Sequence, residues 1–266
     1  MKHLTILLFL FILSCQENTK VKTDKNEAID EKILTDEEIG QAILTEEKVK
    51  INSIGILVYD GFFDLDAFGP HSVLSSIVGT DVFFVAEKKG SVKTSSGIEI
   101  SVTKSIEEVD KLDILLIPGG TVGTVRASKN QNLINWIKKI DQTTKYTTSV
   151  CTGAWILGEA GLLENKKATT NWYRAKEKIE SYNAEFVQER YVQDGKLWTS
   201  AGVSAGIDMS LALVNEIKGE TYAKLVMLNL EYDPKPPLKG GSVENTNKGL
   251  VNHMSGMYDQ ILDTNK

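Results

Sequence analysis

The sequence predicts an α/β protein, a three-layer αβα sandwich built around a mainly parallel sheet. The first observation is a set of short apolar runs with the composition of strands buried on both faces: residues 54–58, 82–86, 113–117 and 146–150. The second is that stretches with apolar residues at helical spacing lie between them, at 65–77 and 132–140. Strands that alternate with helices form parallel βαβ units. A chain of 266 residues, 41% of them hydrophobic, is also long enough to bury a sizeable core.

The N-terminus differs in kind from the rest of the chain. Lys2 is followed by an apolar run at 4–13. This run is too short to cross a bilayer, which takes roughly 20 residues, and is typical of a signal peptide. Residues 12–15, Ile-Leu-Ser-Cys, resemble the lipobox of bacterial lipoproteins. The resemblance implies that residues 1–14 are a signal peptide that is removed, and that Cys15 carries a lipid.

A charged segment follows this predicted anchor. Lys, Glu, Asp and Thr dominate residues 17–50. Residues 15–50 are therefore expected to form a flexible tether, with a short surface helix at 37–47. The charged segment argues against a buried strand at the N-terminus, although a secretory signal with a chance cysteine stays an alternative to the lipobox. We expect the protein to be lipid-anchored to a membrane, on the extracytoplasmic side of the cell envelope.

Charge and composition exclude several partners and sites. The net charge of −6, without a basic stripe, repels phosphate backbones, so nucleic acid is not an expected partner. With Cys15 lipidated, Cys151 is the only remaining thiol, which excludes disulfides and cysteine-based metal clusters. His71, expected to pack near the first helix, and His253 are isolated in the sequence. We therefore expect no metal site and no cofactor.

Two predicted strands end in unusual residues. The strand at 113–117 runs into a Pro-Gly-Gly turn at 118–120, whose backbone N–H groups can approach a ligand closely. The strand at 146–150 runs into Cys151 and then into a helix at 155–160, which is the arrangement of a nucleophile elbow. Because a helix N-terminus stabilises negative charge, the elbow predicts a lowered pKa for the Cys151 thiol. The alternative is that Cys151 is a small buried hydrophobic residue.

Several blocks of the sequence together resemble the ThiJ/PfpI superfamily. They occur in the order that the family has, at 117–120, 149–154, 157–163, 168–170 and 199–208. The resemblance covers residues 51–241, which we take as one domain, followed by a C-terminal tail at 242–266 that is expected to be partly helical. It implies a flavodoxin-like fold with a nucleophile elbow. Because members of the family are commonly homodimers, it also implies a homodimer.

Two further blocks, at 65–71 and 230–237, are most similar to the isocyanide hydratases of this superfamily. This resemblance implies a cysteine-dependent lyase that adds water to an isocyanide, a small molecule, and forms an N-substituted formamide. Similar blocks occur in the sensory halves of AraC-type regulators. Only about 25 residues follow Gly241 here, too few for the DNA-binding helix pair of those regulators.

The resemblance assigns roles to individual residues. Cys151 is the implied nucleophile, Asp66 its acid/base partner, and Thr152 the residue after the nucleophile. The backbone N–H groups of Gly120 and Thr152 are the implied donors to developing charge. Elementary chemistry agrees in part, because a carboxyl at the end of one strand can exchange a proton with a thiol at the end of a neighbouring strand. Asp64 lies two residues before Asp66, and spacing alone does not choose between them.

The sequence departs from the patterns of its family at several positions, and these departures bear on which reaction it can catalyse. Asn171 stands where related proteins often have a histidine, which puts chemistry that depends on an imidazole in doubt. Peptidases of the superfamily place a histidine where Thr152 stands, and glutamine amidotransferases need a His-x-Glu pair that this chain lacks. Both absences count against hydrolysis of amides. Glyoxalase-like, deglycase-like or amidase activity on small reactive molecules is one alternative. A non-catalytic envelope domain that binds ligands or senses oxidants through Cys151 is the other.

Overall fold

The computed structural model describes residues 33–44 and 47–263. Its main sheet has seven strands in the order β10-β11-β7-β6-β1-β2-β5, and only the pairing of β10 with β11 is antiparallel. The bounds of these strands are β1 Ser53–Leu57, β2 Asp81–Ala86, β5 Lys104–Ser105, β6 Ile114–Ile117, β7 Tyr146–Val150, β10 Tyr191–Asp194 and β11 Leu197–Ser200. Two short pairs lie outside the main sheet: β3 Gly90–Lys93 with β4 Glu99–Val102, and β8 Lys167–Ala168 with β9 Glu185–Phe186.

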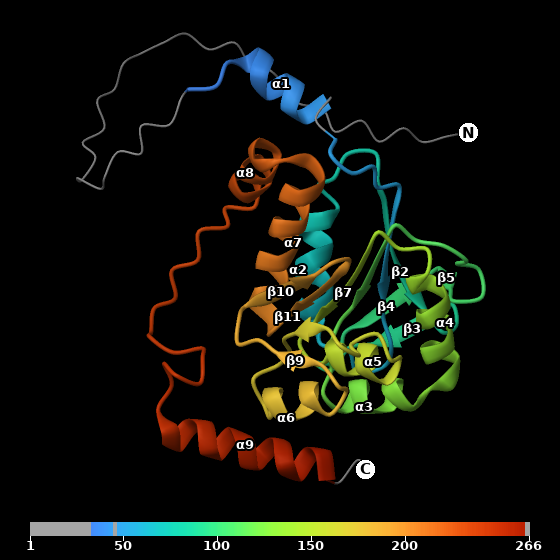
Figure 1. Cartoon of the computed structure of the whole chain (residues 1–266), viewed down its shortest axis with the longest axis vertical. Coiled ribbons are helices and arrows are strands. Elements are labelled where there is room, and N and C mark those ends of the chain that lie inside the picture. The colour runs from blue at the N-terminus through green and yellow to red at the C-terminus, as the bar shows by residue number, and fades with distance from the viewer. Residues whose placement is uncertain (1–32, 45–46, 264–266) are drawn as a thin grey trace. The chain divides into compact units, whose positions relative to one another are not determined.

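Helices cover both faces of this sheet (Figure 1). On one face α2 packs against α7, and α8 packs against α7. On the other face α5 packs against α3, α4 and α6. The bounds are α2 Asp64–Leu74, α3 Val122–Lys129, α4 Gln131–Asp141, α5 Gly153–Glu159, α6 Ala175–Glu180, α7 Val203–Lys218 and α8 Glu220–Asn229. The predicted flavodoxin-like three-layer sandwich is confirmed.

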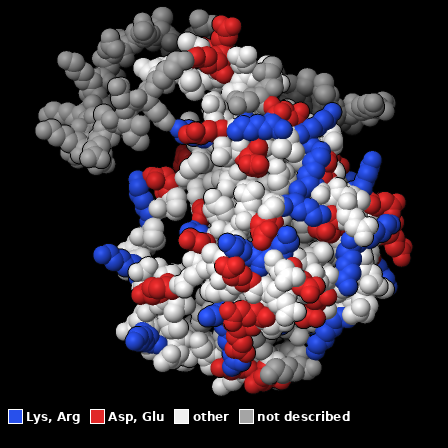
Figure 2. Space-filling model, in the orientation of Figure 1, with Lys and Arg blue, Asp and Glu red and all other residues white. Residues whose placement is uncertain are grey.

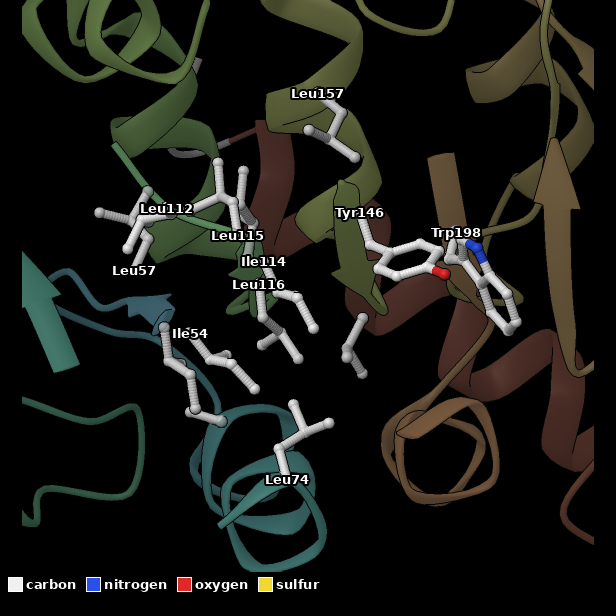
Figure 3. Close-up of a cluster of buried hydrophobic side chains, with 14 of the residues drawn as sticks. Ile54, Leu57, Leu74, Leu112, Ile114, Leu115, Leu116, Tyr146, Leu157 and Trp198 are labelled. Carbon is white, nitrogen blue, oxygen red and sulfur yellow. The ribbon is translucent and has the colours of Figure 1, made fainter. Parts of the chain in front are cut away.

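The buried strands follow from their sequence. Residues 114–117, Ile-Leu-Leu-Ile, are each no more than 1% exposed, because β6 lies between two strands and under helices on both faces. Figure 3 shows Leu74 of α2 and Leu157 of α5 on opposite sides of this strand. Burying one such Leu or Ile side chain stabilises the fold by about 1.5–3 kcal/mol. Pro118, directly after β6, ends the strand because proline cannot donate to the ladder.

The folded part begins earlier than the sequence indicates. The short helix expected at 37–47 within the tether is present as α1 (Asp36–Leu44), but it packs on the domain, because it contacts α8 and buries Ala42. The N–H groups of Lys48 and Val49 also donate to the carbonyl of Ile217. The tether boundary at residue 50 is therefore corrected to about residue 35. Ile39, Ala42 and Ile43 form a short apolar face at helical spacing. The many charged residues around them make this face difficult to recognise from the sequence.

The predicted signal peptide at 1–14 and the lipidation site at Cys15 lie outside the described residues. Within the part of the chain that the structure describes, no helix is long and apolar enough to span a membrane. On the face drawn in Figure 2, Lys and Arg side chains lie among Asp and Glu side chains.

The C-terminal tail forms helix α9 (Lys248–Asp263). Residues 231–247, which connect α8 to α9, contain neither helix nor strand. In Figure 1, α9 runs across the end of the domain where α3 and α6 lie. The carboxyl ends of the parallel strands point to the same end, so α9 lies at the edge where α/β sheets place their ligands.

Candidate active site

The nucleophile elbow is present at the end of β7. Cys151 has a φ of +57°, in the left-handed region that side chains other than glycine rarely adopt, and its N–H donates to the carbonyl of Ser200 at 3.0 Å. A residue held in this conformation costs about 1–3 kcal/mol, which the surrounding contacts must offset. Gly153 opens α5 directly after the elbow. A Cβ at this position would lie 2.2 Å from the carbonyl oxygen of Ile117, so only glycine lets the two strand ends approach this closely.

The turn after β6 packs tightly against the loop after β1. A Cβ on Gly120 would lie 2.3 Å from the carbonyl oxygen of Gly61, so this position also requires glycine. The buried phenol of Tyr59 supports the turn by donating to the carbonyl of Pro118 at 2.6 Å, and it lies 3.1 Å from the Thr124 hydroxyl. The side chain of Tyr59, in the loop after β1, therefore helps to fix the position of the turn after β6.

The Thr152 hydroxyl holds the same turn from the side of the elbow. Its oxygen accepts the N–H groups of Gly120 at 3.0 Å and Thr121 at 3.2 Å, and lies 2.8 Å from the Thr124 hydroxyl. Because the Gly120 N–H donates to Thr152, it is not free to stabilise charge on a substrate in this structure. The expected donor role of Gly120 is corrected accordingly, and the Thr152 side chain is a positioning group for the turn.

Asp66 is buried beside this turn. Its Oδ2 accepts the N–H of Gly119 at 3.0 Å. Its Oδ1 is buried without a well-aligned hydrogen-bond partner, although the carboxyl lies close enough to the Cys151 thiol to interact with it. Burial raises the pKa of Asp66 to about 7, because the Gly119 N–H and the nearby Cys151 thiol only partly offset the cost of a buried charge. A carboxyl with such a pKa can both give and take a proton near neutral pH.

Asp64, the alternative acid/base residue, lies in a different environment. Its Oδ1 accepts from the Ser96 hydroxyl at 2.8 Å, on the segment between β3 and β4. Its slight burial would raise its pKa, but hydrogen bonds from Thr94 and Ser96 outweigh that effect and lower it. The structure therefore places Asp66, and not Asp64, next to the thiol.

The thiol itself differs from the expectation. Burial raises the pKa of Cys151 well above its ordinary value, and the negative charge of Asp66 raises it further. The Thr152 N–H and the Asn171 amide favour the thiolate but are outweighed. The predicted lowering of this pKa by the helix N-terminus is therefore wrong. Because burial raises the pKa of Cys151 above that of Asp66, the carboxyl loses its proton before the thiol does.

Asn171 has a role that the sequence did not indicate. Its side-chain Nδ2 donates to the Cys151 Sγ at 3.4 Å. The N–H of Tyr173 donates to the Asn171 Oδ1 at 3.0 Å, which fixes the amide so that its NH₂ group faces the sulfur. Thr170 donates to the carbonyl of Cys151 at 2.8 Å and holds the elbow from the same segment. An amide donor thus occupies the position where related proteins often have an imidazole.

His71 and His253 lie in different parts of the structure. His71 stacks on Phe84 at 5.0 Å near the end of α2, as expected for a packing residue, and His253 is exposed on α9. Among residues 33–44 and 47–263, no group of three or more His, Cys, Asp or Glu residues could hold a metal ion.

Sequence reasoning missed one residue at the site. The phenol of Tyr258 on α9 lies near enough to the side chains of Thr121 and Asn171 for both to lower its pKa, although burial raises that pKa overall. More than 80 residues separate Asn171 from Tyr258 in the sequence, and no motif connects them. Only the aromatic pair Trp172-Tyr173 and the lone Tyr258 in a polar helix hint at a shared contact.

Comparison with known proteins agrees with the elbow and the sheet. Residues 52–216 match the DJ-1/PfpI family. The chain belongs to this family. The result confirms the resemblance to the ThiJ/PfpI superfamily in the sequence.

Individual DJ-1/PfpI proteins support the assignment. An isonitrile hydratase from Pseudomonas putida is 36% identical over 198 residues, which cover 74% of this chain and 86% of the relative. A deglycase from Thermococcus kodakarensis is 29% identical over 149 residues, covering 55% and 87%. A crystal structure of a ThiJ/PfpI family protein from Pseudomonas syringae superposes with a TM-score of 0.78 at 32% identity, covering 82% and 90%.

Proposed function

We propose that this protein is a cysteine-dependent enzyme that adds water to an isocyanide and releases an N-substituted formamide. The observation that carries the proposal is the buried pair of Cys151 and Asp66, in which a carboxyl of pKa about 7 interacts with a nucleophilic thiol. The similarity to an isonitrile hydratase supports the same reaction. An isocyanide is neutral, so it can enter a buried site without the desolvation penalty of a charged substrate.

The first half of the reaction moves the thiol proton of Cys151 through Asp66 to the isocyanide carbon. Asp66 takes the thiol proton as the Cys151 sulfur bonds to the terminal carbon of the isocyanide. Asp66 then gives that proton to the same carbon, which yields a thioimidate on the enzyme. Asn171 stabilises the negative charge on sulfur before the attack, because its amide already faces the Sγ atom.

The second half consumes water. The water oxygen bonds to the thioimidate carbon, and Asp66 transfers a water proton to the nitrogen. Asp66 then takes the hydroxyl proton as the carbon–sulfur bond breaks, and returns it to sulfur. The net reaction consumes one isocyanide and one water and leaves Cys151 and Asp66 as they began. Proton transfers by one positioned carboxyl of this kind accelerate reactions by about 10²–10⁴-fold.

A deglycase-like activity on reactive carbonyls is the second candidate, favoured by the similarity to the Thermococcus kodakarensis protein. A turnover assay of residues 16–266 against an isocyanide and against methylglyoxal, beside the Cys151→Ala variant, separates the two. The proposal predicts formamide production that requires Cys151 and little consumption of methylglyoxal. Consumption of methylglyoxal alone would replace the proposal with the second candidate.

The oligomeric state and the membrane anchor of the protein are also proposals. We propose that the protein acts as a homodimer, and that a lipid on Cys15 anchors it to a membrane on the extracytoplasmic side of the cell envelope. The first is tested by sedimentation, the second by the fractionation experiment described below. Low peroxide concentrations provide a test of the sensing alternative. A sensor would change its binding behaviour on oxidation of Cys151, whereas an enzyme would only lose turnover.

A further inference from the structure

The C-terminal helix brings an aromatic side chain to the reactive thiol. Tyr258 stacks on Tyr173, two residues after Asn171, and Asn171 donates to the Cys151 Sγ. Burial raises the pKa of Tyr258, and the charges of Cys151 and Asp66 contribute to this shift, as expected if the phenol faces the pair. Cys151 is only 8% exposed.

One short segment makes several of the contacts that hold α9 in place. The ring of Tyr258 stacks on Tyr173 with centroids 4.8 Å apart, and meets Trp172 edge-on at 5.5 Å. The carboxylate of Asp259 accepts from the Tyr173 hydroxyl and from Arg174 at 2.6 Å. Trp172, Tyr173 and Arg174 directly follow Asn171, so the same segment orients the thiol and binds the helix.

Helix α9 lies at the surface of the domain. None of its residues is buried, and the 231–247 connection has no regular structure to resist movement. A cleft of about 500 Å³ lies beside the helix, lined by residues that include Trp155, Lys178 and Leu262. Segments with few buried contacts open at low free-energy cost, so α9 can lift without disturbing the core.

We propose that α9 is a lid over the Cys151 site, and that the ring of Tyr258 determines the size of the molecule that reaches the thiol. Asp259 holds the lid closed through Tyr173 and Arg174. The rings that pack together next to Asn171, those of Trp172, Tyr173 and Tyr258, present aromatic faces that suit a compact, uncharged reactant with an apolar or aromatic substituent. The inference rests on the proposed function only in taking Cys151 as the reacting group.

Alkylation of Cys151 in the full chain tests the lid without requiring turnover. Rates are measured with iodoacetamide, a small reagent, and with a dye-linked maleimide, a bulky one. Tyr258→Ala should accelerate the bulky reagent about tenfold more than the small one, whereas Tyr258→Phe keeps the ring and should keep the wild-type ratio. Asp259→Ala should accelerate both reagents by about tenfold, because a hydrogen bond to a charged group is lost from the closed state.

Met257→Ala is the matched control on the same helix. Met257 is 43% exposed and makes none of the ring or carboxylate contacts described, so both rates should stay within about twofold of wild type. The proposal is overturned if Tyr258→Ala and Asp259→Ala react at wild-type rates, or if Met257→Ala accelerates as much as they do. Circular dichroism verifies folding, and if Tyr258→Ala unfolds, Asp259→Ala decides the outcome. Absence of formamide in the turnover assay would remove the hydratase proposal and leave this result standing.

Discussion

Replacement of Asp66 by asparagine should abolish activity and stabilise the protein at the same time. The variant keeps the shape of the side chain and an oxygen that can accept the Gly119 N–H. It removes the only carboxyl that interacts with the Cys151 thiol among the residues described. Because the proposed reaction moves every proton through Asp66, kcat should fall by about 10²–10⁴-fold.

The gain in stability follows from the raised pKa of Asp66. A shift from its ordinary value of 3.8 to about 7 corresponds to roughly 4 kcal/mol, taken as an upper bound. The folded-state pKa lies above the unfolded one, so the stability that this carboxyl contributes is complete below about pH 4 and is lost as the pH rises through about 7. The advantage of Asp66→Asn over wild type should therefore grow by about 2–3 kcal/mol between pH 5 and pH 8.

Urea denaturation at pH 5 and pH 8, together with formamide production, measures both effects. Asp64→Asn is the matched control two residues away. Hydrogen bonds lower the pKa of Asp64, so its loss should destabilise the fold slightly at neutral pH, less so in acid, and should leave turnover intact. A stability difference for Asp66→Asn that does not change with pH would refute the buried-carboxyl reasoning. Full turnover by the same variant would make Asp64 the next candidate.

Three further predictions test other parts of the site and the chain. Asn171→Ala loses the amide donor to the sulfur, so kcat/KM should fall by about 10- to 100-fold; unchanged kinetics would show that the donor is not used. Gly120→Ala places a Cβ 2.3 Å from a backbone oxygen, so urea denaturation should show a loss of at least about 1–3 kcal/mol, and wild-type stability would contradict the tight turn. Cys15→Ala should move the protein from the membrane fraction to the soluble fraction, and a protein that stays membrane-bound would exclude the lipid anchor.

The fold could be predicted because its signals are local. Each of the four apolar runs identified in the sequence is a strand within one residue of its expected bounds, since strands buried on both faces need continuous apolar residues. The nucleophile elbow could be predicted for the same reason, because Cys151 lies directly between a strand and a helix. The helix at α1 was expected, but its packing on the domain was not, because a few apolar residues among many charged ones give a weak pattern.

The pKa values and hydrogen bonds of the site could not be predicted from local sequence patterns. The helix N-terminus suggested a lowered thiol pKa, but the burial of Cys151 and the nearby carboxyl of Asp66 dominate, and both depend on the tertiary structure. The donor assigned to Gly120 is used by Thr152, a contact between residues 32 positions apart. Tyr258 reaches the site from a helix whose position no local pattern specifies.

The most direct test of the account is the covalent bond between Cys151 and an isocyanide. Rapid quenching of the wild-type enzyme during turnover, followed by intact-mass measurement and peptide mapping, should show an adduct of the mass of the isocyanide on Cys151, formed and lost at rates that support formamide release. The Cys151→Ser variant should show neither adduct nor product. Formamide production by Cys151→Ser at the wild-type rate, or turnover by wild type without any adduct on Cys151, would contradict the central claim.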